Sequence, residues 1–267
     1  QRLMVAELAR LRHRLGGDGD ALALTTAVAE SRAAMPAPAA IDVLAEMFEL
    51  SAFERDILLL CAGAEMDGGL AARLATASPT GRGRVSFGLA LGALDQPHWS
   101  AITPVRPLRR WRLIEVDDSA GLVSGALRID ERVLHYIAGV NHLDGRLRSL
   151  LEDLAPPVAL ARSHRETAER ARVLLQEPRA ARSAILQLTG DDPLGQHDVA
   201  SQLAVDLGRS AFMLRGEDIP AGHDEVAALA RLWDREAMLL GAILVVAIDE
   251  STLSRPARRL LEQIHGP

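Results

Sequence analysis

The sequence predicts a mainly helical N-terminal part that ends in a β-hairpin, followed by a partial α/β part with a parallel sheet. Three patterns favour this fold class. Apolar residues recur at helical spacing along residues 1–102. Two extended segments, 111–116 and 122–129, then flank a stretch rich in Asp, Ser and Gly. From residue 184 onward, short apolar runs alternate with helical patterns, as in parallel strands joined by helices.

The N-terminal helices are predicted from apolar residues that recur every three or four positions. They are expected at residues 1–15, 21–34, 41–48, from 51 onward, 85–93 and 99–102. The fourth of these helices has the strongest start signal, because Ser51 and Glu54 have the spacing of a capping box. The single cysteine, Cys61, falls inside this helix, so we expect a small core residue that forms no internal disulfide.

The hairpin and a following helix at residues 130–139 complete a winged-helix-like module. The first strand follows a basic stretch that contains Arg106, Arg109, Arg110 and Arg112. These arginines could face DNA phosphates. A solvated or partner-facing surface is the favoured interpretation, because a charge run by itself is a poor indicator of nucleic-acid binding.

The segment from Gly190 to His197 has the glycine spacing of a Walker A phosphate loop, G-x-x-x-x-G-K-[ST]. An apolar strand at 184–188 and helical spacing at 198–207 provide the strand, loop and helix that the motif needs. Gln196 and His197, however, stand where lysine and a hydroxyl residue are required. All 30 basic residues of the chain are arginine, so no lysine elsewhere can take over this role. The pattern therefore predicts a nucleotide-binding frame with altered working side chains.

The loop itself is the candidate cofactor-binding site, because backbone N–H groups at a helix N-terminus attract phosphate. It consists of Gly190, Asp191, Asp192, Pro193, Leu194, Gly195, Gln196 and His197. ATP or ADP with Mg²⁺ is the cofactor expected for such a frame, at most weakly bound, and a loop that binds no nucleotide is the alternative. Gln196 and His197 do not match their motif roles and are more simply explained as surface residues at a helix start.

A second apolar run, at 242–248, has the length and β-branched composition of a buried strand and ends in Asp249 and Glu250. In phosphate-loop enzymes an Asp holds Mg²⁺, and a Glu beside it can polarise the attacking water. Asp249 is therefore the candidate magnesium ligand, and Glu250 is the candidate, vestigial catalytic residue. The alternative is that the two acids only cap the end of a strand.

The remaining elements set the expected domain organisation. A linker at 155–162 precedes a helix that Ser163 and Glu166 open with capping-box spacing and that ends at Gln176. A strand is expected at 211–214, a helix at 224–240 and a last helix from Ser254. The divisions are an N-terminal helical segment at 1–35, a winged-helix-like domain at 36–150, a linker and helix at 151–180, and a partial nucleotide-binding domain at 181–267.

Composition limits the kinds of partner. The net charge of −6 argues against a general nucleic-acid binder, which needs a basic surface. No apolar run approaches the ~18 residues that span a bilayer, and residues 1–10 form an amphipathic pattern rather than a signal peptide. We therefore expect a cytoplasmic protein that contacts no membrane and whose partners are proteins.

These motifs resemble those of the AAA+ ATPases, and among them a bacterial type with an N-terminal winged-helix-like region. The similarity is carried by segments 50–61, 107–115, 127–135, 190–197 and 232–241 and by the strand that ends in Asp249 and Glu250. Within that family the chain is similar to the ATPases associated with phage-tail-like contractile injection systems, whose first ATPase module is often degenerate. The resemblance implies a homo-oligomeric ring, a protein substrate or assembly partner, and ATP or ADP with Mg²⁺.

The same resemblance implies further parts: a fourth strand with a sensor residue, a fifth strand, an arginine finger and a helical lid. We therefore expect these residues to belong to a longer polypeptide. The favoured function is a degenerate nucleotide-binding module that supports assembly or protein remodelling and does not hydrolyse ATP alone. A winged-helix DNA-binding regulator with a nucleotide-sensing domain, and a structural adaptor that uses no nucleotide, are the alternatives.

Overall fold

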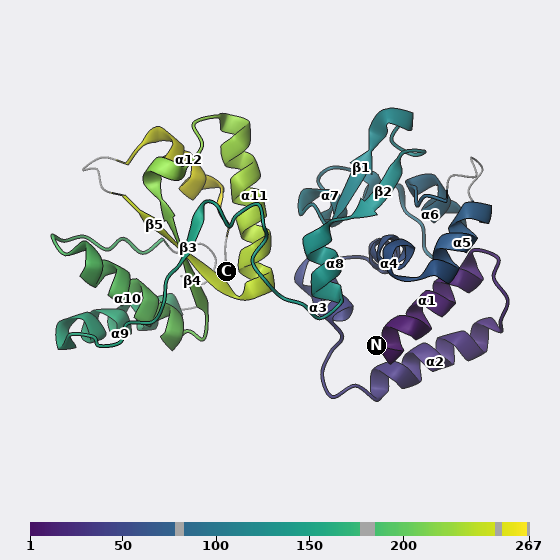
Figure 1. Ribbon diagram of the computed structural model, residues 1–267, viewed down its shortest axis with the longest axis horizontal. Helices are drawn as coiled ribbons and strands as arrows, with labels where there is room; N and C mark the ends of the chain where they lie inside the picture. Colours follow the sequence, from purple (N-terminus) through teal and green to yellow (C-terminus); the bar gives the residue numbers. More distant parts are fainter. Residues whose placement is uncertain (78–82, 177–184, 249–252, 266–267) are drawn as a thin grey trace. The chain divides into compact units, whose positions relative to one another are not determined.

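The computed structural model describes residues 1–77, 83–176, 185–248 and 253–265. The chain divides into two compact units, Gln1–Val140 and Asn141–Pro267 (Figure 1). The N-terminal unit is mainly helical and contains one hairpin, whereas the C-terminal unit combines a small sheet with helices. The sequence had placed the corresponding boundary after residue 150.

The N-terminal unit follows the predicted order of helices and hairpin. Its elements are α1 (Arg2–Arg14), α2 (Ala21–Ala33), α3 (Ala40–Met47), α4 (Ala52–Met66), α5 (Gly68–Ala77), α6 (Phe87–Ala93), η1 (Trp99–Ile102), α7 (Pro107–Arg110), β1 (Ile114–Asp117), η2 (Asp118–Ala120), β2 (Ala126–Ile129) and α8 (Glu131–Ile137). Two of these helices, α5 and α7, lie in stretches for which the sequence predicted no helix. α5 begins with two glycines and α7 has a single turn, so neither gives a clear helical pattern.

Helix α4 is the most deeply buried helix of this unit. The Ser51 hydroxyl accepts a hydrogen bond from the Glu54 N–H at 3.1 Å, and the Glu54 carboxylate accepts one from the Ser51 N–H at 2.9 Å. The predicted capping box is therefore confirmed. The side chains from Ile57 to Ala62 are all buried, so the helix is covered on every side. Cys61 is among them, as expected, and burial raises the pKa of its thiol.

The predicted hairpin is also confirmed. β1 and β2 pair antiparallel, with Ile114 opposite Ile129 and Val116 opposite Leu127. Its strands are shorter than the expected 111–116 and 122–129, because α7 ends just before β1 and the turn η2 follows it directly. Asp130 then caps α8, since its carboxylate accepts a hydrogen bond from the N–H two residues later at 3.1 Å.

Ion pairs join the first four helices. Glu7 of α1 is 2% exposed and accepts hydrogen bonds from Arg10, Arg32 and Arg55 at 3.1, 3.0 and 2.6 Å. Asp42 of α3 accepts further hydrogen bonds from Arg32 and Arg55. Burial alone would raise the pKa of Glu7, but the guanidinium groups of Arg55 and Arg10 outweigh it and hold that pKa below its ordinary value. These pairs tie α1 and α2 to the rest of the unit.

The C-terminal unit contains β3 (Leu151–Asp153), α9 (Arg162–Gln176), α10 (Pro193–Asp206), β4 (Ser210–Arg215), η3 (Gly216–Asp218), α11 (His223–Leu240), β5 (Ala242–Ala247) and α12 (Arg255–Gln263). Strands β4 and β5 are parallel and are connected through α11, as the sequence predicted for residues 211–248. Trp233 of α11 packs edge-on against Phe212 of β4, with ring centroids 6.1 Å apart, in the core of this unit.

Two predictions about this sheet are wrong. The sheet is mixed rather than parallel, because β3 pairs antiparallel with β4, with Leu151 opposite Leu214. β3 has only three residues, too few for a recognisable strand pattern. The strand expected before the phosphate loop is also not formed, since residues 185–189 have no regular structure and Ile185 is 65% exposed. β3 and β5 occupy both edges of β4, and residues 185–189 pair with neither of these two outer strands.

Helix α9 ends at Gln176 as predicted but begins at Arg162, one residue before the expected cap. Ser163 therefore lies inside the helix. The Glu166 carboxylate accepts a hydrogen bond of 2.8 Å from the Arg162 side chain, four residues earlier, and does not close a capping box. The capping prediction is wrong here because the helix already begins at Arg162, which places Ser163 in the first turn and not at the N-cap.

Candidate functional site

The predicted phosphate loop lies at the start of α10. The helix begins at Pro193 rather than near residue 198, which leaves Gly190 to Asp192 as the loop before it. Asp192 is the N-cap: its carboxylate accepts a hydrogen bond from the Gly195 N–H at 2.9 Å. Its main-chain carbonyl accepts another from the Gln196 N–H at 3.0 Å. Two of the N–H groups that were expected to hold phosphate are therefore already bonded within the protein.

Two further side chains contact the loop residues. The Gln196 side-chain amide donates to the Gly190 carbonyl oxygen at 3.0 Å. His164 of α9 lies beside Asp192, with 3.8 Å between its Nε2 and the nearer carboxylate oxygen. A methyl group added to Gly195 would collide with both Asp192 and His164. Protein side chains therefore fill the space next to Gly195.

These residues do not fit the phosphates of a nucleotide. A carboxylate, Asp192, already lies where the N-terminus of α10 attracts an anion, and its charge repels a second one. Gln196 offers no cation and His197 offers no hydroxyl group for a metal ion. The loop residues from Gly190 to Leu194, Asp192 among them, are all exposed.

The two acids predicted at the end of the second strand, Asp249 and Glu250, lie outside the described residues. The strand that precedes them, β5, is formed as predicted. Within the described ranges, no three His, Cys, Asp or Glu side chains lie close enough together to hold a metal ion.

Arg106, the first residue of the basic stretch before the hairpin, is bound within its own unit. It donates hydrogen bonds of 3.1 and 2.8 Å to the two carboxylate oxygens of Glu54, which is fully buried. Burial alone would raise the pKa of Glu54, but the bonds from Arg106 and Ser51 hold it below its ordinary value. Arg106 therefore anchors the start of α7 to α4.

The other arginines of this stretch also have local contacts. Arg109 donates to the Ile102 carbonyl oxygen at 2.8 Å. The Arg110 guanidinium lies over the ring of Trp111, 4.8 Å from the ring centroid. Arg112 adopts the left-handed backbone conformation between α7 and β1. The sequence did not indicate these contacts, because several of the partners lie on other elements.

A buried charge cluster in the C-terminal unit was missed by the sequence analysis. Arg235 and Glu236 of α11 are fully buried, and Asp144 is 3% exposed on its side chain. The Asp144 carboxylate accepts hydrogen bonds from Arg235 and Arg146, each at 2.6 Å. Burial alone would raise the pKa of Asp144, but Arg146 and Arg235 hold it below its ordinary value. The one available signal was a pair of opposite charges in the middle of a largely apolar helix.

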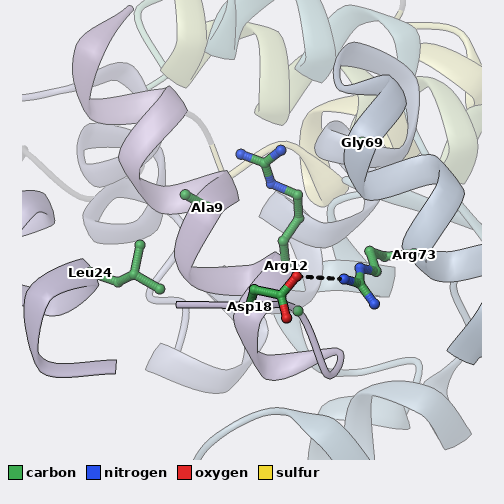
Figure 2. A pocket seen from close by; sticks show the side chains of 7 residues that line it. Ala9, Arg12, Asp18, Leu24, Gly69 and Arg73 are labelled. Atoms are coloured by element: carbon green, nitrogen blue, oxygen red, sulfur yellow. Dashed lines mark ion pairs between the residues drawn. The ribbon is translucent and has the colours of Figure 1, made fainter. Parts of the chain in front are cut away.

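The N-terminal unit contains a cavity of about 400 Å³ beside α1, α2 and α5 (Figure 2). It is lined by Ala9, Arg12, Gly17, Asp18, Leu24, Gly69 and Arg73. Asp18 and Arg73 form an ion pair in which the nearest nitrogen and oxygen are 3.5 Å apart. The lining residues come from separate segments, which is why no single stretch of sequence pointed to this cavity.

A helical unit that carries a two-stranded antiparallel hairpin is typical of winged-helix domains. A family model described as winged helix domain, variant, matches residues 6–151, which is more than half of the chain. The chain belongs to this family. No curated protein and no solved structure matches the chain. The predicted winged-helix-like region is thereby confirmed.

Across the described ranges, every helix is too short or too polar to cross a membrane.

Proposed function

We propose that this chain is an assembly module, in which a winged-helix domain is joined to an AAA+-type α/β unit that has lost its nucleotide site. The observation that carries the proposal is the Asp192 carboxylate, which caps α10 where a phosphate group would bind. The glycine spacing from Gly190 to Gly195 and the β4–α11–β5 crossover support an origin in a phosphate-loop frame. The proposed setting is a ring of several copies that supports protein remodelling, with partner proteins of a contractile injection system.

The arginine contacts favour this role over DNA binding. Arg106 and Arg109 direct donors toward the buried Glu54 and toward the Ile102 carbonyl group, inside the unit. A winged-helix regulator would need such cations on a surface that meets phosphates. The acidic net charge of −6 points in the same direction.

Nucleotide binding tests the role of Asp192. We expect Gln196→Lys with His197→Thr to gain little affinity for Mg-ADP, because the carboxylate still occupies the helix end. Adding Asp192→Gly removes that carboxylate, while glycine at the N-cap lowers helix stability by only a few tenths of a kcal/mol. The triple variant should bind Mg-ADP roughly fivefold more tightly than the double variant, since two like charges about 4 Å apart repel by roughly 1 kcal/mol in a water-like environment, and Asp192 is 61% exposed. Isothermal titration calorimetry measures this difference.

The matched control combines Gln196→Lys and His197→Thr with Asp191→Gly. This change removes the same charge from the neighbouring residue, which is exposed and does not cap α10. Equal affinities of the two triple variants would show that only net charge matters. Tight binding of Mg-ADP by the unaltered chain would contradict the proposed loss of the site.

Binding to duplex DNA distinguishes the assembly role from the DNA-binding alternative. We expect weak binding that changes little between low and physiological salt, because Arg106 and Arg109 of the basic stretch are bonded within the unit and the chain is acidic. A protein with 6–10 phosphate contacts would lose roughly 10³–10⁵ in affinity between about 50 and 200 mM salt. Fluorescence anisotropy with a labelled duplex gives the slope, and a steep slope that Arg110→Gln reduces would favour the regulator.

A further inference from the structure

Two arginines at the cavity of the N-terminal unit have only distant acidic partners. The nearest nitrogen of Arg12 is 3.9 Å from a carboxylate oxygen of Asp67, and that of Arg73 is 3.5 Å from Asp18. Among the described residues, Arg12 makes no side-chain hydrogen bond, and Arg73 makes one, to the Gly16 carbonyl oxygen at 3.3 Å. The arginines that bind Glu7 in the same unit have contacts of 3.1 Å or less. Most donors of Arg12 and Arg73 are therefore available to another acceptor.

The carboxylate now beside Arg73 is easily replaced. Asp18 is fully exposed on the loop between α1 and α2. Figure 2 shows its carboxylate turned toward the Arg73 guanidinium, whereas the Arg12 guanidinium lies apart from this pair. An ion pair with an exposed partner and long geometry contributes little. An incoming acid therefore displaces Asp18 at small cost.

We infer that this cavity binds an oxyanion, a carboxylate or a phosphate group, which takes the place of Asp18 at Arg73 while Arg12 supplies a second positive charge. The planar guanidinium presents paired N–H donors that match the oxygens of either group. The side chains of Arg12 and Arg73 are 36% and 41% exposed, so the cavity walls partly shield them from water.

The size and the charge balance of the cavity limit its ligand. Its volume of about 400 Å³ accommodates a single acidic group with a small apolar neighbour against Ala9 and Leu24. Asp67, which caps α5, offsets part of the positive charge, so binding is expected to be weak and salt-sensitive. This site is independent of the α10 loop and of the proposed assembly function.

An NMR titration of the whole chain tests the inference with two probes, inorganic phosphate and an acetylated tetraglutamate peptide. Saturable shifts of the Arg73 Nε–H signal and of the Gly16 and Gly17 amides are expected with at least one probe. The probe that binds more tightly shows whether the anion comes from a phosphate source or from a polypeptide.

Arg73→Gln should weaken binding of that probe about tenfold, because it removes a charged hydrogen-bond donor. Asp18→Asn should strengthen it about two- to fivefold, because the competing acid is lost.

The controls are Arg128→Gln and Glu115→Gln, which make the same charge changes at exposed, opposed positions of the hairpin. They should leave both affinities within about twofold, the range expected for screened charges outside the site. Asp18→Asn keeps both arginines, so the test remains decisive if Arg73→Gln disturbs folding. Non-saturable shifts with both probes, or equal effects of the cavity and hairpin variants, would overturn the inference.

Discussion

Arg235→Ala is expected to lower the free energy of unfolding of the C-terminal unit by about 3–5 kcal/mol, the loss observed when one partner of a buried ion pair is removed. Arg235 is fully buried and donates to Asp144 at 2.6 Å and to Glu236 at 3.3 Å. Without the guanidinium, two carboxylates stay in the interior with less positive charge to balance them. Hydrogen exchange of the α11 and β4 amides, resolved by peptide, measures this decrease in the free energy of unfolding.

The control is Arg231→Ala on the same helix, because this arginine is exposed. This substitution should change the free energy of unfolding by no more than about 0.5 kcal/mol, as most surface substitutions do. Arg235→Met separates charge from volume, since it keeps most of the side chain. If Arg235→Met is as stable as the unaltered chain, the buried charge does not stabilise this unit and the prediction is wrong.

Glu7→Gln is expected to lower the stability of the N-terminal unit by about 2–3 kcal/mol at neutral pH, because hydrogen bonds to charged partners contribute roughly 1.5–3 kcal/mol. Glu7 is the acid shared by Arg10, Arg32 and Arg55, which lie on three different helices. The amide keeps the shape of the side chain but donates hydrogen where the guanidinium groups need an acceptor. Urea unfolding, read from hydrogen exchange of α1 and α4 amides, measures the change.

The effect of Glu7→Gln should shrink in acid. The folded pKa of Glu7 lies below its ordinary value, so the charged form stabilises the folded state above about pH 4.3, the ordinary pKa of a glutamate. That contribution is lost as the pH falls through the folded pKa, and the variant lacks it at every pH. Glu30→Gln on α2, which removes the same charge from an exposed acid, is the control. If the difference in the free energy of unfolding between Glu7→Gln and the unaltered chain stays constant down to pH 3, the assigned role of Glu7 is contradicted.

Much of the local structure could be predicted because its causes are close together in the sequence. The Ser51 and Glu54 pair predicted the start of α4, and both hydrogen bonds of the capping box are formed. The apolar spacing of residues 224–240 and the β-branched run that follows predicted α11 and β5. The turn-forming residues between 116 and 122 predicted the hairpin. Each of these signals acts over a few residues, where propensity and capping dominate.

The candidate nucleotide site illustrates the opposite case. The spacing of Gly190 and Gly195 predicted the motif, and Gln196 and His197 predicted its altered chemistry. The sequence could not show that Asp192 would cap the helix, because Asp191 and Asp192 are both suitable N-caps. Nor could it place His164, from another helix, beside this loop. The state of the site depends on where α10 begins and on how α9 packs against it.

The sequence by itself determined the capped start of α4, the hairpin, the winged-helix class of the N-terminal unit, and the presence of Gln196 and His197 where a phosphate loop requires lysine and a hydroxyl residue. Only the tertiary structure decided the antiparallel pairing of β3, the absence of a strand at 185–189, and the meeting of Asp144 with Arg235 across 91 positions. The physical reason is the range of the interactions. Capping and periodicity act within one or two turns, whereas strand partners and buried ion pairs are selected when distant segments compete for the same edge or interior space.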